Sequence, residues 1–234
     1  MADHLAHAAL LAGATGLIGH ALAAQWAGPG DLHLLVRRPL AAPGAHCRVR
    51  VVDFAALPRL PAAGSAFCCL GTTIRQAGSR EAFRAVDFDA VLAFARAARA
   101  AGVQRFAVVS ALGANPGSGS FYLRVKGEME EALRELGFAQ LVIVRPSLLT
   151  GNRAALGQPA RLGEVLALAL TAPLAPLIPR AWRPISGATV ARAMMRALAQ
   201  EQEQEQGQGH GQEREQAPPG CRVIESAELL ELGR

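Results

Sequence analysis

Lysine and tyrosine are almost absent from this chain of 234 residues, which has one of each, Lys126 and Tyr122. The chain has 24 lysines and arginines together, and all of them except Lys126 are arginine. Aromatic residues make up only 5% of the sequence. A composition so biased toward arginine is expected to use arginine wherever a plain positive charge suffices. The two rare residues stand four positions apart, so on a helix they share one face. We interpret them as a functional pair, with an ordinary surface neighbour pair as the alternative.

Cysteine is also scarce, and its four copies show neither the spacing of a metal site nor a dense disulfide pattern. We therefore predict no metal. The cysteines are Cys47, Cys68, Cys69 and Cys221. Buried, reduced thiols are consistent with a cytoplasmic location, and the N-terminal segment lacks the basic region of a signal peptide. A cytoplasmic protein is expected.

Long apolar runs and concentrated basic runs are missing as well. The run Leu162–Pro179 is apolar, but three prolines and Glu164 argue against a membrane span. The net charge is +5, and residues 200–216 carry five Glu and one Arg, which leaves the rest of the chain at +9. Because the arginines are dispersed and do not alternate with aromatics, a nucleic-acid surface is excluded. The basic charge favours a phosphate-bearing small molecule as partner.

Short apolar runs alternate with helical stretches from the start of the chain. Buried strands are predicted at Ala8–Ala12, Leu32–Val36, Val49–Val52, Ala66–Leu70, Phe106–Ser110 and Leu141–Val144. Helices are predicted at Leu17–Ala27, Arg80–Ala101 and Ser120–Leu136. Continuous apolar strands separated by helices indicate a parallel sheet covered on both faces. The predicted fold is α/β, a Rossmann-like doubly wound parallel sheet with a small C-terminal cap.

A single domain is predicted over residues 1–234, with its core at about 1–150 and the cap, a last strand and a last helix within 151–234. Further helices are expected near Leu162–Leu170 and Ala188–Ala199, then a strand at Cys221–Ile224 and a helix capped by Ser226. The segment 200–220, rich in Gln, Glu and Gly, is expected to be a disordered linker. Nothing in the sequence indicates an oligomeric state.

A glycine-rich turn, Gly13-Ala14-Thr15-Gly16-Leu17-Ile18-Gly19, follows the first predicted strand. Glycines at such a place allow a tight turn, a close approach to a pyrophosphate and tight packing of the next helix. The N-terminus of that helix then offers free N–H groups to the phosphates. The spacing is one residue longer than the usual dinucleotide fingerprint. The candidate cofactor-binding residues of this turn are Gly13, Thr15, Gly16, Leu17, Ile18 and Gly19.

Cofactor choice is read at the end of the second predicted strand, where Arg37 and Arg38 stand without an acidic residue. An acidic side chain there binds the ribose 2′-hydroxyl of NAD, whereas arginine accommodates the 2′-phosphate of NADP. We therefore favour NADP(H) over NAD(H), with two solvated surface arginines as the alternative. Asp53, after the third strand, is a candidate for the adenine edge and could equally cap the following turn.

Ser110 ends a predicted strand twelve residues before Tyr122. In a doubly wound sheet ligands bind beyond the carboxyl ends of the strands, near the start of the helix that carries Tyr122 and Lys126. A phenol has a free pKa of about 10, and a nearby fixed cation favours its anion. The pair therefore suits acid–base chemistry on a carbonyl or an alcohol, with Ser110 holding the substrate oxygen. The alternative for Ser110 is a plain strand end.

The Gly13–Gly19 turn, Ser110 and Tyr122-x-x-x-Lys126 together resemble the short-chain dehydrogenase/reductase superfamily. The closer resemblance is to an atypical branch, the Tat-interactive-protein-like oxidoreductases. It rests on Cys69-Leu70-Gly71-Thr72-Thr73, Val86-Asp87, Tyr122-Leu123-x-Val125-Lys126-Gly127-Glu128, Arg145-Pro146 and Arg183-Pro184-Ile185-Ser186.

The resemblance implies that Ser110, Tyr122 and Lys126 are catalytic and that Lys126 also holds the nicotinamide ribose hydroxyls. It implies NADP binding by the glycine turn with Arg37 and Arg38, and a cofactor cleft lined by Leu70 and Gly71. Two features depart from the wider superfamily. Asp87 stands where extended members often carry Asn, and the cap is shorter than in sugar-nucleotide epimerases.

The function predicted from these features is NADPH-dependent reduction of a small carbonyl compound. One alternative is a redox-sensing or regulatory protein that holds NADPH with little turnover. Another is an epimerase or dehydratase with tightly held NAD, which the arginine pair counts against. The identity of the substrate does not follow from the sequence.

Overall fold

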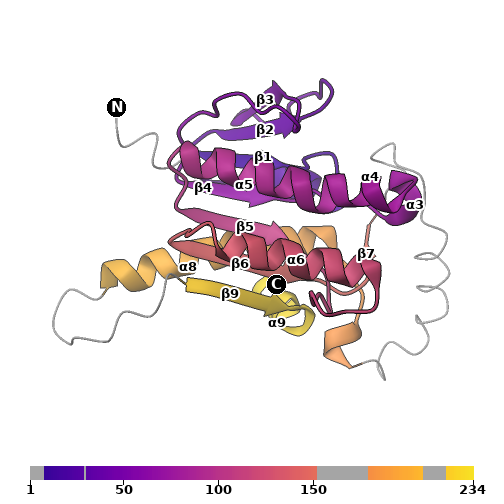
Figure 1. Cartoon of the computed structure of the whole chain (residues 1–234). Coiled ribbons are helices and arrows are strands. Elements are labelled where there is room, and N and C mark those ends of the chain that lie inside the picture. Colours follow the sequence, from indigo (N-terminus) through magenta and orange to yellow (C-terminus); the bar gives the residue numbers. More distant parts are fainter. Residues whose placement is uncertain (1–7, 29, 152–178, 208–219) are drawn as a thin grey trace.

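The computed structural model describes residues 8–28, 30–151, 179–207 and 220–234. Within these ranges seven strands form one sheet in the order β3-β2-β1-β4-β5-β6-β9, with every neighbouring pair parallel (Figure 1). In sheet order the strands are β3 (Cys47–Val51), β2 (Leu32–Val36), β1 (Ala9–Ala12), β4 (Ser65–Cys68), β5 (Arg105–Val109), β6 (Gln140–Arg145) and β9 (Gly220–Glu225). This order confirms the predicted doubly wound α/β fold.

The helices lie on both faces of the sheet. They are α2 (Leu17–Ala24), α3 (Ile74–Ala77), α4 (Arg80–Arg84), the π-helix η1 (Ala85–Asp89), α5 (Ala90–Ala100), α6 (Phe121–Arg134), the short 3₁₀ turn η4 (Arg180–Trp182), α8 (Gly187–Gly207) and α9 (Ser226–Leu232). Helices α5 and α6 cover the face turned toward the viewer in Figure 1, and their apolar side chains join one core. Helices α2, α8 and α9 contribute to the core on the other face.

The central strands are apolar throughout because both of their faces are covered. In β1 all four residues are buried, with Leu10 in the core under α5 and α6 and Leu11 in the core under α2 and α8. Alternate residues of a strand point to opposite faces, so a strand buried on both sides needs a continuous apolar run. Strand β9 pairs in parallel with β6, so the last described strand extends the main sheet.

The crevice for a ligand is expected where the strand order reverses, between β1 and β4. From β1 the chain runs outward to β2 and β3, and it then returns to the other side of β1 to form β4. The segments that follow β1 and β4 therefore meet at the carboxyl edge of the sheet.

Two predicted elements differ in the structure, and a third lies outside the described residues. The helix predicted at Arg80–Ala101 consists of α4, the π turn η1 and α5, and α3 precedes it. Helix α8 runs to Gly207 and so enters the segment 200–220 that we expected to be disordered, because Glu and Gln are strong helix formers. The helix predicted near Leu162–Leu170 lies outside the described residues, as do residues 208–219 of the predicted linker.

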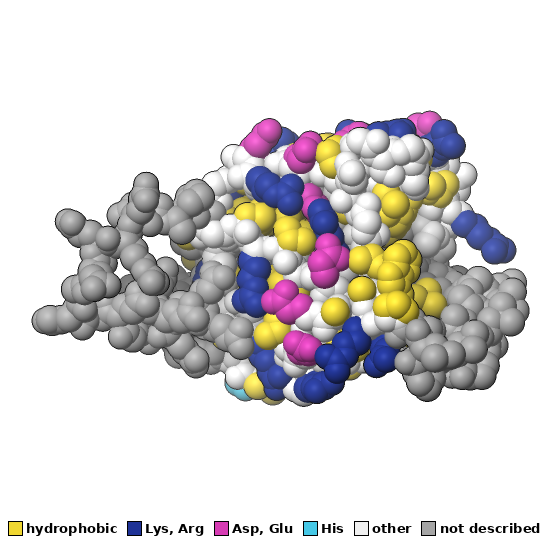
Figure 2. Space-filling model, turned by 90° about the horizontal axis from the view of Figure 1, so that it is seen from below, with side chains coloured by type: hydrophobic (Ala, Val, Ile, Leu, Met, Phe, Trp, Pro, Cys, Tyr) yellow, Lys and Arg dark blue, Asp and Glu magenta, His cyan; other side chains and the backbone are white. Residues whose placement is uncertain are grey.

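Two short strands, β7 (Leu149–Thr150) and β8 (Ile185–Ser186), pair in parallel and form a second small sheet in the cap region. Seen from below, the surface carries basic and acidic side chains next to one another (Figure 2). One ion pair at the surface of the described chain joins Arg222 and Glu228, whose charged atoms are 2.5 Å apart. In the described part of the chain, no helix has both the length and the apolar character needed to cross a membrane.

Candidate active site

The glycine turn packs against the end of β4 more closely than any side chain allows. Gly13 has a φ of +89°, and a Cβ built on it would lie 2.4 Å from the carbonyl carbon of Cys69. A Cβ on Gly19 would lie 2.2 Å from the carbonyl oxygen of Gly13. Two of the three glycines are thus required by the fold itself. Gly16 is different, since its Cβ would be 3.4 Å from the nearest atom, the Gly13 oxygen.

Helix α2 begins directly after Gly16, which is extended and caps the helix without a side-chain hydrogen bond. The first turn of α2 carries no acidic residue, so its positive end is not neutralised within the helix. Thr15 is exposed, Leu17 is half-buried, and Ile18 is buried in the core. A Cβ on Gly187 would lie 2.9 Å from the Leu17 backbone, so the cap touches this helix start. The turn has the form of an anion-binding helix N-terminus.

Arg37 and Arg38 follow β2 at the same edge of the sheet, and both are exposed. Neither guanidinium makes a hydrogen bond or an ion pair with another described residue, so both are open to an anion. Asp53 is exposed, and its Oδ1 accepts a hydrogen bond of 2.9 Å from the Ala55 N–H. Asp53 therefore caps the turn after β3, which was the second of its two predicted roles.

The segment after β4 connects the cofactor half of the site to the chemical half. Leu70 is half-buried against the core under α5 and α6, and Gly71 is exposed. A Cβ on Gly71 would lie 3.4 Å from Asp87 Oδ1 and 3.8 Å from Lys126 Nζ. Gly71, one of the two predicted cleft residues, is thus next to the lysine.

Lys126 forms a buried ion pair with Asp87. Its Nζ is 2.7 Å from Asp87 Oδ1, and the two side chains are only 3% and 0% exposed. Nζ also donates to the Val109 carbonyl at 3.4 Å. Burial by itself lowers the pKa of Lys126, but attraction to Asp87, and secondarily to Tyr122, outweighs it and raises the pKa above its ordinary value of 10.5. Lys126 is therefore an ammonium at neutral pH.

Tyr122 lies in the first turn of α6, one turn before Lys126, and is half-buried. Its ring packs on Phe83 with centroids 5.4 Å apart. The loop before α6 is fixed by close contact, since a Cβ on Gly127 would lie 2.2 Å from the Pro116 nitrogen. The Asn115 N–H also donates to the Leu123 carbonyl at 3.1 Å. The start of α6 is therefore held firmly.

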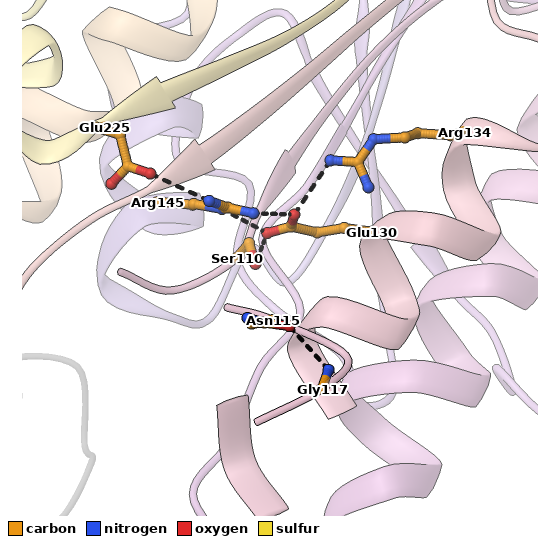
Figure 3. A network of polar contacts seen from close by, with 7 residues as sticks. All are labelled: Ser110, Asn115, Gly117, Glu130, Arg134, Arg145 and Glu225. Atoms are coloured by element: carbon orange, nitrogen blue, oxygen red, sulfur yellow. Dashed lines mark hydrogen bonds and ion pairs between the residues drawn. The ribbon is translucent and has the colours of Figure 1, made fainter. Parts of the chain in front are cut away.

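Ser110 belongs to a different set of contacts, shown in Figure 3. Its hydroxyl donates to Glu130 Oε1 at 2.5 Å, and both residues are buried. Arg145 binds the same carboxylate through two bonds, Nε to Oε1 at 2.9 Å and Nη2 to Oε2 at 2.6 Å. Arg145 also reaches Glu225 at 3.1 Å, and Arg134 reaches Glu130 at 3.3 Å. Hydrogen bonding to Glu130 raises the pKa of Arg145, while burial opposes the change.

The structure brings Tyr122 and Lys126 together, but no described contact joins Ser110 to Tyr122. Glu130, the partner of Ser110, stands eight residues after Tyr122 on α6, a helix rise of about 12 Å. The Ser110 proton is already donated to Glu130. Its predicted role as the holder of the substrate oxygen stays a prediction.

Sequence reasoning missed Glu130 as the partner of Ser110, and Arg145 as the partner of Glu130. The signal was the spacing Tyr122, Lys126, Glu130, which continues one helix face by steps of four. Arg145 gave a second signal, because a charged residue ending a buried strand needs a partner.

A family model described as NAD(P)H-binding matches residues 13–201. This chain belongs to that family. It is 39% identical to protein HTATIP2 of Rattus norvegicus over 155 residues, which are 63% of this chain and 60% of the rat protein. It is 35% identical to the mitochondrial protein FMP52 of Debaryomyces hansenii over 153 residues, which are 62% of this chain and 68% of that protein. These relatives confirm the predicted kinship with the atypical short-chain dehydrogenase/reductase group.

Among solved structures, MoeE5 in complex with UDP-glucose and NAD has a similar fold. The TM-score is 0.63, the identity is 18%, and the match covers 96% of this chain and 80% of that one. The chain thus has a Rossmann fold and belongs to an NAD(P)H-binding family.

The prediction of a cytoplasmic location is wrong. The fungal FMP52 relatives are named as mitochondrial proteins, which points away from the cytoplasm. The sequence signal used for that prediction, reduced cysteines without a signal peptide, does not separate the cytosol from other reducing compartments.

Proposed function

We propose that this protein is an NADPH-dependent oxidoreductase that reduces a small carbonyl compound, with Tyr122 as the proton donor. The observation that carries the proposal is the pairing of Tyr122 and Lys126. The only tyrosine and the only lysine of the chain stand one turn apart on α6, and Lys126 is buried beside Gly71. A buried ammonium is costly to maintain, so its presence next to a phenol favours a chemical role.

The residues for the cofactor fit a phosphorylated dinucleotide. The glycine turn and the uncapped start of α2 suit a pyrophosphate, because backbone N–H groups and the helix dipole both favour an anion. Arg37 and Arg38 are exposed at the end of β2, where they would hold a 2′-phosphate. This arrangement supports NADPH over NADH.

When bound, the nicotinamide supplies a hydride to the carbonyl carbon. Tyr122 gives its phenolic proton to the carbonyl oxygen, which becomes the hydroxyl of the product alcohol. Lys126 keeps a positive charge next to the phenol, so the phenolate left after proton transfer is stabilised. Asp87 and the Val109 carbonyl hold the ammonium in place. The role of Ser110 in holding the substrate oxygen stays a prediction, because its hydroxyl donates a hydrogen bond to Glu130.

An epimerase or dehydratase that holds NAD is the second candidate, supported by the similarity in fold to MoeE5. Such an enzyme returns the hydride to its substrate and consumes no cofactor. The exposed pair Arg37 and Arg38 favours the reductase. A protein that only senses NADPH is the third candidate, and a Tyr–Lys pair would be dispensable in it.

The test is NADPH oxidation by the purified protein across a broad panel of aldehydes and ketones, with Tyr122→Phe measured in parallel. We expect a loss of turnover of at least about a hundredfold in Tyr122→Phe, as befits a general acid. NADPH affinity, followed by its fluorescence, should be unchanged. Ser120→Ala is the matched control, because it removes a hydroxyl two residues away that makes no capping bond. Full turnover by Tyr122→Phe would contradict the proposal, and no oxidation across the panel would favour the sensor.

A further inference from the structure

We infer that Asp87 is a positioning residue of this site, which fixes the Lys126 ammonium between Gly71 and the first turns of α6. The catalytic part of this inference rests on the proposed function. The placement of Asp87 stands on its own contacts and is tested separately below.

A π-helical turn puts Asp87 into the site. The helical stretch from Arg80 to Ala100 is α-helical at both ends, but Ala85–Asp89 forms a π turn between α4 and α5. Single π turns in otherwise α-helical stretches are rare and occur frequently at functional sites. Within this turn the Asp87 side chain is fully buried, whereas Asp89 is exposed. The irregular turn therefore delivers one carboxylate to the interior.

Both oxygens of this carboxylate are in contact with the site. Oδ1 forms the 2.7 Å ion pair with Lys126, and Oδ2 accepts a 2.8 Å hydrogen bond from the Thr72 N–H. Gly71 lies between these two contacts, with its backbone close enough that a Cβ would reach 3.4 Å from Oδ1. Asp87 therefore ties three segments together: the one after β4, η1 and α6. A change at Asp87 would disturb the lysine and the predicted cofactor cleft at once.

The charge of Asp87 is what allows a buried lysine here. The groups that act on Lys126 come from three elements: Asp87 on η1, Tyr122 on α6 and Cys68 on β4. Burial raises the pKa of Cys68 to about 12, so this thiol is uncharged at ordinary pH. Attraction to Asp87 is the strongest of the effects that raise the pKa of Lys126. Burial without this partner would favour loss of the lysine proton.

Removal of the Asp87 carboxylate should change the pH dependence of the reaction in one direction. In Asp87→Asn the lysine loses its proton at lower pH, and then no cation stands beside Tyr122. Reduction needs a protonated phenol next to an ammonium. Earlier loss of the ammonium therefore moves the upper pH limit of reduction to lower pH.

The sole lysine makes a direct measurement possible. Untagged protein labelled with ε-¹³C-lysine gives one lysine side-chain NMR signal, whose pH titration reports Lys126 alone. In folded wild-type protein the midpoint should lie above 10.5. In Asp87→Asn it should fall by at least about one pH unit, the usual effect of losing a contacting opposite charge. Asp89→Asn, an exposed residue of the same π turn, is the control and should not change the midpoint.

The second arm is the pH profile of NADPH oxidation for the same three proteins. The upper limb should move to lower pH by about one unit in Asp87→Asn and remain in place in Asp89→Asn. A wild-type midpoint below 10.5, or an unmoved midpoint in folded Asp87→Asn, overturns the placement. If Asp87→Asn lowers the titration midpoint of Lys126 but leaves the upper limb of the pH profile in place, the positioning role is overturned. If the wild-type protein shows no turnover, the proposed function fails, but the Lys126 titration still tests the placement of Asp87. If Asp87→Asn does not fold, the titration of the wild-type protein alone tests that placement.

Discussion

At the scale of single residues, the three glycines of the first turn have different reasons to be glycine. Gly13 has a positive φ and lies against the Cys69 backbone, and Gly19 lies against the Gly13 oxygen. These two are fixed by packing. Gly16 has ordinary φ and room for a methyl group, so the protein itself does not require glycine there. A bound pyrophosphate would require it, because the phosphate approaches the backbone at this point.

Gly16→Ala and Gly13→Ala should therefore separate cofactor binding from folding. We expect Gly16→Ala to keep its unfolding temperature and to lose at least about tenfold in NADPH affinity, or about 1.4 kcal/mol. Gly13→Ala should lower the unfolding temperature by several degrees, since about 1 kcal/mol shifts it by 2–4 °C in a chain of this size. Thermal melting and NADPH titration check both. Unchanged affinity in Gly16→Ala would remove the glycine turn from the cofactor site.

Single residues were predictable where chemistry depends on residue type and not where it depends on local geometry. The placement of Tyr122 and Lys126 on one helix was predicted because they are unique and four apart, which makes them neighbours on any α-helix. The pairing of Asp87 with Lys126 was not predicted, because a π turn shifts the direction of a side chain in a way that α-helical spacing does not show. Ser110 was assigned by its place at a strand end, and its bond to Glu130 required the packed structure.

At the scale of elements, the carboxyl ends of β5, β6 and β9 are joined to α6 by the network around Glu130. Glu130 is only 1% exposed, and Arg145 is its bidentate partner. A buried carboxylate that loses such a partner retains its desolvation cost without compensation. The network thus holds the strand ends that surround the site.

Arg145→Met should destabilise the protein by about 3 kcal/mol, near the low end for a broken buried pair because Arg134 and Ser110 still contact Glu130. Arg222→Met removes the half-exposed pair with Glu228 and should cost less than about 1 kcal/mol. Urea unfolding of the two variants and wild type measures both values. Equal costs would show that the Glu130 network does not stabilise the strand ends.

The strands of the main sheet were predicted to within two residues at each end, because its central strands are buried on both faces and read as continuous apolar runs. The two-residue strands β7 and β8 were not predicted. Helix interruptions were not predictable in the same way. The stretch from Arg80 to Ala101 has one apolar pattern, and the split into α4, η1 and α5 reflects the contact of Asp87 with Lys126 and Thr72.

At the scale of the whole molecule, the strand order brings the ends of β1, β2 and β4 to one edge. The glycine turn, Arg37 and Gly71 follow these three strands, so a single extended ligand could contact all of them. A ligand that binds only the folded chain stabilises it, by about 2.7 kcal/mol at a hundred times its dissociation constant. Stability in the presence of each cofactor therefore reports cofactor choice.

NADPH should raise the unfolding temperature more than NADH at equal concentration. In Arg37→Ala the effect of NADPH should fall to that of NADH, with the effect of NADH unchanged, because under the proposal the guanidinium would contact only the 2′-phosphate. Arg96→Ala, at an exposed position of α5, is the matched control. Equal stabilisation by the two cofactors in wild type would contradict the choice of NADPH.

The most direct test of the central claim is transfer of deuterium to a carbonyl substrate found in the panel from NADPH that carries deuterium at both positions of nicotinamide C4. The account predicts one deuterium on the carbinol carbon of the product with wild-type protein. It predicts none above background with Tyr122→Phe, although both proteins bind NADPH equally. An unlabelled product, or equal transfer by Tyr122→Phe, would contradict it.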